Sequence, residues 1–224
     1  MNPKTLLCIL LVAGVAFAAA GQDEPTSVAE EADASPADAG EEPAIDPLTQ
    51  LSEPGDHHEH LDRLAGDWDL TIRVWASIDG EPIESAGTAE ARWILDRRFL
   101  WTIYRAELFG QPFEAWSIVG YDNQANQYVG TWRDTQGTYT LVYRGKCKQP
   151  PPPEDGTEVE PVAEGTYREM TTKITDPVSG QQLDIRTELR IQEEGGFVQE
   201  SFIVLSAEES LKNLEMIGQR RSDD

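Results

Sequence analysis

The chain has 224 residues, of which 41 are Asp or Glu and 18 are Lys or Arg, so its net charge at pH 7 is −23. Twelve of the acidic residues lie in residues 21–60, a stretch that contains no Lys or Arg. The remainder of the chain is also acidic, with 29 acidic and 17 basic residues after position 60. Such a surface repels phosphate backbones and anionic lipid, so we expect no binding to nucleic acid, and after signal cleavage no membrane span.

Residues 1–20 have the organisation of a secretory signal peptide. Lys4 supplies a positive charge, and residues 6–17 form an apolar segment too short to span a bilayer. Small residues follow and form A-x-A cleavage sites. We therefore expect cleavage and export to the periplasm or the medium, with a retained N-terminal anchor as the alternative. Cleavage would leave Cys147 as the only cysteine, so we expect no internal disulfide.

Residues 21–53 are expected to form a disordered acidic linker. They consist mainly of Ala, Asp, Glu, Pro and Ser, and they have too few large apolar groups to offset the entropy of the chain. The pattern changes at residues 54–65, where Leu61 and Leu64 are spaced for one face of a helix. Asp56 is placed to cap this helix and Gly66 to end it. We expect it to plug one end of the following domain.

After this helix, ten segments alternate apolar and polar residues, as half-buried strands do. Turn residues separate most of them, but residues 149–161 contain five prolines and read as a long loop. Consecutive hairpins predict an all-β domain over residues 54–221, a single antiparallel up-and-down barrel with a short N-terminal helix at one end. A barrel of this size can hold one small ligand. The predicted strands are residues 68–76, 83–95, 98–109, 113–121, 126–134, 138–146, 162–175, 181–192, 197–206 and 211–220.

Two resemblances support this fold. Gly66-Asp67-Trp68 resembles the G-x-W opening of lipocalin-like (calycin) barrels, in which the Trp packs across the closed end. Several blocks together are similar to a bacterial family of uncharacterised proteins, catalogued as domain of unknown function 1579, over about residues 55–220. That resemblance implies a lipocalin-like barrel and supplies no activity or ligand; residues 149–161 look like an insertion in it. The matching blocks begin at His58 and include residues 87–93, 98–100, 109–114, 120–123, 128–134 and 175–180.

Three histidines in the predicted helix raise the question of a metal site. His57 and His60 are three residues apart and share a helical face, but the chain has no further His beyond these two and His58. We therefore expect no metal and no other cofactor. His58 belongs to the family pattern, and we expect it to form a hydrogen bond that holds the helix against the barrel.

Charged pairs and aromatic residues are the candidates for a ligand site. Glu90 and Arg92 share one face of a predicted strand, and Arg105 and Glu107 repeat the pair on the next strand. If they point inward they would orient a polar group of a ligand, and if outward they are ordinary surface pairs. Alternation leaves both open, because Ala91 and Trp93 occupy the other face. The predicted ligand-binding residues are Glu90, Arg92, Trp93, Tyr104, Trp116 and Trp132.

Three functions remain open at this stage. The leading one is a binding protein that carries a small, mostly apolar molecule inside the barrel. The second is an isomerase or hydrolase that uses interior polar groups, drawn from Glu90, Arg92, Tyr104, Asp134 and His58; no nucleophile and no poised base are evident. The third is a packed barrel that acts through protein contacts.

Overall fold

The structure, a computed structural model, describes residues 51–75, 77, 80–149, 163, 165–176, 180–192 and 195–221. The expected signal peptide, residues 21–50 of the expected linker and nearly all of the proline-rich segment at 149–161 lie outside the described residues. Among the described residues, no helix is long and apolar enough to cross a membrane.

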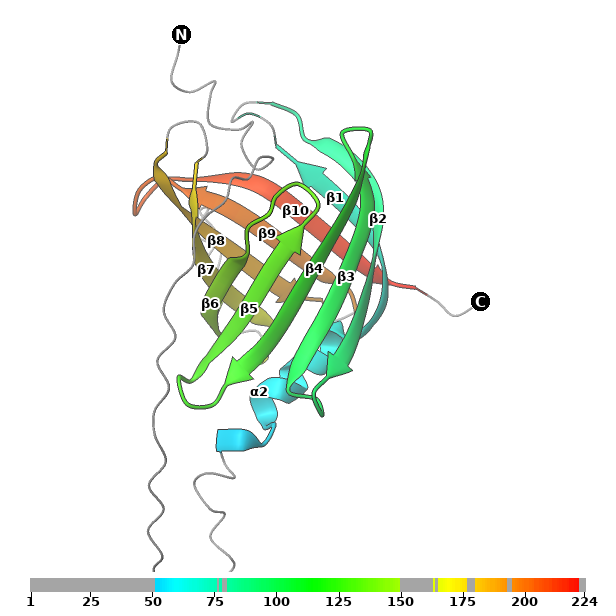
Figure 1. Cartoon of the computed structure of the whole chain (residues 1–224), viewed down its shortest axis with the longest axis vertical. Helices are drawn as coiled ribbons and strands as arrows, with labels where there is room; N and C mark the ends of the chain where they lie inside the picture. The colour runs from blue at the N-terminus through cyan, green and yellow to red at the C-terminus, as the bar shows by residue number, and fades with distance from the viewer. Residues whose placement is uncertain are drawn as a thin grey trace, which may run out of the picture.

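Ten antiparallel strands form a closed barrel, which confirms the predicted fold class (Figure 1). Each strand pairs with its neighbours in the sequence, and β1 pairs with β10 to close the sheet. The strand boundaries lie within a few residues of those expected, except that β7 begins later. The strands are β1 (Gly66–Val74), β2 (Ile83–Ile94), β3 (Phe99–Leu108), β4 (Gln111–Asp122), β5 (Gln127–Asp134), β6 (Leu141–Cys147), β7 (Tyr167–Thr175), β8 (Gln182–Ile191), β9 (Phe197–Val204) and β10 (Ser210–Arg220).

Alternation along each strand separates the inner face of the barrel from the outer face. In β1, Trp68, Leu70 and Ile72 are buried, whereas the residues between them are half-buried or exposed. Alternate side chains of a strand lie on the same face of the sheet, and in a closed barrel one of the two faces points inward. These residues therefore form the core. The core of buried side chains continues with Ala89 in β2 and Phe197 in β9.

A short helical segment covers one end of the barrel (Figure 1). It consists of α2 (Asp56–Glu59) and a 3₁₀ turn, η2 (His60–Leu64), and Leu61 is fully buried. The start of the helix differs from the expectation: Gly55 is the N-cap, and its N–H donates to Nδ1 of His58 at 3.1 Å. Gly55 thus holds the cap position expected of Asp56, which is the first helical residue, and the side chain of His58 accepts the N–H of this cap residue.

Trp68 fixes this helical segment to the barrel. It is 1% exposed and donates from Nε1 to the carbonyl oxygen of Leu64 at 2.9 Å. Arg220, from the last strand, lies 4.5 Å above the Trp68 ring and donates to the carbonyl oxygen of Ala65 at 2.8 Å. A side chain on Gly66, whose φ is +126°, would collide with the Arg220 guanidinium, so this position requires glycine.

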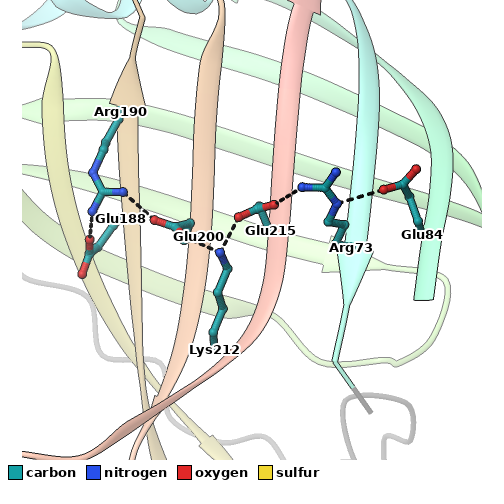
Figure 2. Close-up of polar contacts among 7 residues, drawn as sticks. All are labelled: Arg73, Glu84, Glu188, Arg190, Glu200, Lys212 and Glu215. Carbon is teal, nitrogen blue, oxygen red and sulfur yellow. Dashed lines mark hydrogen bonds and ion pairs between the residues drawn. The ribbon is translucent and has the colours of Figure 1, made fainter. Parts of the chain in front are cut away.

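A row of charged side chains on the outer face of the barrel crosses the seam between β1 and β10 (Figure 2). Three of its members are carboxylates on adjacent strands, and like charges directly opposite one another destabilise a sheet. The row therefore requires cations from neighbouring positions. In spatial order across β2, β1, β10, β9 and β8, its cross-strand neighbours are Glu84, Arg73, Glu215, Glu200 and Glu188.

A β-bulge supplies one of these cations. The register of β10 shifts between Lys212 and Leu214, so Lys212 and Glu215 lie on the same face although they are three positions apart, an odd number. Lys212 therefore donates to Glu200 at 2.5 Å and to Glu215 (Figure 2). Arg190 of β8 supplies a second cation: it pairs with Glu200 at 2.6 Å and with Glu188 at 2.8 Å.

We expect Lys212→Met to lower the free energy of unfolding at pH 7 by about 1–3 kcal/mol, because it removes the cation between the poorly exposed Glu200 and Glu215, which then keep only Arg190 and Arg73 as partners. Urea denaturation measures this. The matched control is Lys173→Met, which removes an exposed pair with Asp184 and should cost below about 0.5 kcal/mol. Equal losses in the two variants would contradict this account.

The same network predicts a pH dependence. Burial would raise the pKa of Glu215, but hydrogen bonds from Lys212 and Arg73 outweigh burial and hold that pKa below its ordinary value. The stabilisation is therefore complete above the ordinary pKa of a glutamate and is lost as the pH falls through the lowered value. The stability difference between the native chain and Lys212→Met should accordingly shrink on acidification from pH 7.

Candidate functional site

The barrel encloses a cavity of about 140 Å³ to which all ten strands contribute. Pockets for drug-sized ligands measure roughly 300–1,000 Å³, whereas an engineered cavity of about 150 Å³ holds benzene. The interior of this protein is therefore neither filled solid nor large enough for a bulky ligand. Its size limits any occupant to a small molecule.

Small side chains on the barrel wall create this space. Ala89 and Ala91 of β2 line the cavity, and so do Ser117 of β4 and Gly130 of β5. Large aromatic side chains also border the cavity: Trp68 and Phe197 pack edge to face with ring centroids 5.0 Å apart. Among the described residues the wall is mainly apolar, with hydroxyl and amide groups at a few positions.

Two tyrosines bring hydroxyl groups to the cavity. Burial raises the pKa of Tyr104 to about 12, against the opposing effects of Thr102 and the charge of Arg168. Burial likewise raises the pKa of Tyr143, which interacts with Thr187. Both tyrosines are therefore protonated at neutral pH and are able to donate hydrogen bonds to an occupant, but they do not serve as bases there.

Arg168 is the one basic residue among those that line the cavity. It lies on the inner face of β7, is 8% exposed, and its Nε has no hydrogen-bond partner among the described residues. Its guanidinium carbon lies 4.9 Å from the centre of the Tyr128 ring. No salt bridge joins Arg168 to a carboxylate in the described part of the chain. Burial lowers its pKa, and the groups that oppose this are Tyr128, Cys147 and Tyr104.

Tyr128 connects Arg168 to the helical segment at the end of the barrel. It is fully buried, and its hydroxyl donates to the carbonyl oxygen of His57 at 3.1 Å. The hydroxyl oxygen of Tyr128 also lies 3.3 Å from Nδ1 of His60 and 3.5 Å from Sγ of Cys147. The Tyr128 ring is thereby held in one orientation, with its face toward the guanidinium.

The three histidines have structural contacts at this end. His58 is buried, and burial lowers its pKa in spite of hydrogen bonds to the backbone of Gly55 and Tyr121, the second of which lies in β4. This contact agrees with the expected role of His58 in holding the helix against the barrel. His57 stacks on Tyr121 with ring centroids 4.0 Å apart. The described residues contain no group of three metal-ligating side chains placed to hold an ion.

The predicted ligand-binding residues occupy three different places. Tyr104 and Trp132 line the cavity. Trp93 lies at the end of the barrel covered by the helical segment and donates to Asp62 of η2 at 2.7 Å. The other three are on the outer face, which settles the open question of which way the charged pair points: Glu90 binds Arg105, Arg92 binds Asp67, and Trp116 packs on Trp101.

The groups considered for catalysis do not converge. Asp134 accepts hydrogen bonds from Trp132 Nε1 at 2.8 Å and from the backbone N–H of Gln136 at 2.9 Å, which is a turn-stabilising role. Glu90 and Arg92 lie outside the barrel, and His58 belongs to the helical segment. Within the described residues, none of these groups forms a nucleophile–base pair in the cavity.

Arg168 is not among the ligand-binding residues predicted from the sequence, although the sequence contains a signal for it. In the predicted strand at 162–175, Arg168 has the same parity as Met170 and Ile174, so the apolar face of that strand includes it. The opposite face carries Glu169 and Lys173, which marks it as the solvent side. A charged residue in the apolar register of a strand is the pattern that identifies it.

Comparisons with known proteins place the fold but not an activity. The sequence profile of a family described as "Protein of unknown function (DUF1579)" matches residues 53–220. No functionally curated protein matches the chain. The crystal structure of Rv2717c from M. tuberculosis is similar with a TM-score of 0.51 and 10% identity, covering 76% of this chain and all of that one. A redesigned β-barrel is similar with a TM-score of 0.34 and 14% identity, covering 73% of this chain and 96% of that one.

We expect Tyr128→Phe to lower the free energy of unfolding by about 1–3 kcal/mol, because it removes the hydroxyl that donates to the partly buried carbonyl of His57. Chemical denaturation measures the loss. Tyr121→Phe is the matched control: its ring packs 5.0 Å from that of Tyr128, but the described residues offer its hydroxyl no hydrogen bond. A Tyr128 variant no less stable than the Tyr121 variant would refute the structural role.

Proposed function

Since the chain belongs to the DUF1579 family of proteins of unknown function, we propose from its structure that it binds or carries one small, mostly apolar molecule inside the barrel. The observation that carries this proposal is the cavity of about 140 Å³ within a closed sheet. Natural cores are packed to the density of organic crystals, so an interior space of this size is unusual in a domain whose only task is to fold.

The composition of the wall supports an apolar occupant. Apolar side chains dominate it, and aromatic faces from Trp68, Tyr104, Trp132 and Phe197 border the space. An apolar molecule that enters such a cavity gains dispersion contacts with side chains that otherwise face a void. The few hydroxyl and amide groups would then orient the molecule rather than supply most of the affinity.

The proposal predicts that filling the cavity abolishes binding. Ser117 of β4 lines the cavity, so Ser117→Phe places a ring in the space that toluene would occupy. We expect the native chain to be stabilised by toluene in a thermal melt, because a ligand that binds only the folded state raises the melting temperature. In Ser117→Phe the apparent affinity for toluene, obtained from this increase in melting temperature, should be at least about tenfold weaker.

The control is Ile118→Phe, which adds the same ring at the next residue. That residue has the opposite parity in β4, so its side chain lies on the outer face. Its toluene response should equal that of the native chain. A native chain that toluene does not stabilise, or a Ser117 variant with the native response, would reject the proposal.

We propose in addition that the barrel acts after export. The support is the charged, apolar and small-residue organisation of residues 1–20. Mass spectrometry of the protein isolated from its own host should detect a chain that begins after this segment. An intact segment on the isolated protein would reject export by cleavage.

A further inference from the structure

The buried guanidinium of Arg168 is the strongest unexplained feature of the cavity. The side chain is 92% buried and lines the space, and its Nε is buried without a partner among the described residues. An arginine keeps its charge under all physiological conditions. A full positive charge therefore borders an otherwise mainly apolar cavity.

Nothing in the described part of the chain neutralises this charge with an anion. Its closest electrostatic partners are the ring of Tyr128, 4.9 Å away, and the side chains of Cys147 and Tyr104. An aromatic face offsets only part of the cost of removing a guanidinium from water. A buried charge without a counter-ion destabilises the fold, so its presence requires a reason outside the packing of the ligand-free barrel.

We propose that the molecule held in the cavity is a small monocarboxylate, whose apolar part fills the space and whose carboxylate pairs with Arg168. This inference rests on the proposed function and specifies its ligand class. The planar fork of a guanidinium matches the two oxygens of a carboxylate. One monoanion also balances the single charge, whereas a phosphate dianion would bring a second, unpaired charge into the cavity.

The acidic surface does not argue against such a ligand. The chain carries a net charge of −23, so an approaching anion is repelled at long range. That repulsion acts mainly on the rate of association and is screened within about 8 Å at physiological ionic strength. Inside the barrel the local charge is that of Arg168. The expected consequence is an association rate that increases with added salt.

Two matched pairs of probes test the inference by calorimetric titration. They are benzoate with benzamide, and hexanoate with hexanamide, so that each acid is compared with a neutral molecule of nearly the same shape. The native chain should bind each acid about 10- to 100-fold more tightly than its amide, as expected for a charge-assisted hydrogen-bonded pair. Arg168→Met, which keeps an unbranched apolar stem, should lose this preference and retain binding of the amide.

Two further variants keep the test decisive. Arg168→Lys retains the charge without the planar fork and should show an intermediate preference. Arg105→Met removes an arginine of the outer face, which pairs with Glu90 and Glu114, and should leave the preference unchanged. The ligand-free Arg168→Met protein should also melt no lower than the native chain, because the substitution removes an uncompensated buried charge.

The outcomes separate the two proposals. If the acids and amides bind the native chain equally well, or if the preference persists in Arg168→Met, this inference is overturned while the small-molecule function stands. If the native chain binds neither acid nor amide and does not respond to toluene, both the function and the inference fall.

Discussion

The pairing of β1 with β10 is the constraint on which the rest of the molecule depends. It joins the two ends of the sheet, so every strand has two hydrogen-bonded neighbours and the described barrel has no free edge. Closure of ten strands fixes the circumference, and the inner face then encloses more volume than small residues such as Ala89 and Gly130 fill. The cavity is therefore a consequence of strand number and of side-chain size on the wall.

The same closure locates the covered end of the cavity. Trp68 lies near the start of the first strand and Arg220 ends the last, so pairing of these two strands brings the guanidinium onto the indole and both against the helical segment. Leu61 and Tyr128 complete this end from the helical segment and from β5. Residues that are more than 150 positions apart in the sequence thus form one structural unit, and Arg168 lies at its inner surface.

Much of this architecture was predictable, because the strands obey a period of two and turns separate them. Alternation predicted ten strands and the barrel, the spacing of Leu61 and Leu64 predicted the covering helix, and the G-x-W resemblance placed Trp68 at the closed end. Alternation gives the parity of side chains but not which parity faces inward. In β2 both faces were plausible, and the structure places Ala89 and Ala91 inside and Glu90 outside. The β-bulge before Leu214 changes which alternate residues of β10 face inward, and no local residue pattern predicts it.

The charged side chains of the row on the outer face of the sheet have partners of opposite charge, whereas the arginine on the inner face has none among the described residues. On the outside, Arg73, Lys212 and Arg190 provide every carboxylate of a crowded row with a cation, even at buried positions such as Glu188. Inside, the described residues give Arg168 the face of Tyr128 but no carboxylate. A single carboxylate on the inner face of a strand beside β7 would compensate the charge of Arg168, just as the surface carboxylates and cations compensate one another. An interior cation without that carboxylate is therefore best explained by a counter-ion that arrives with a ligand, because affinity for a ligand is obtained at the expense of stability in its absence.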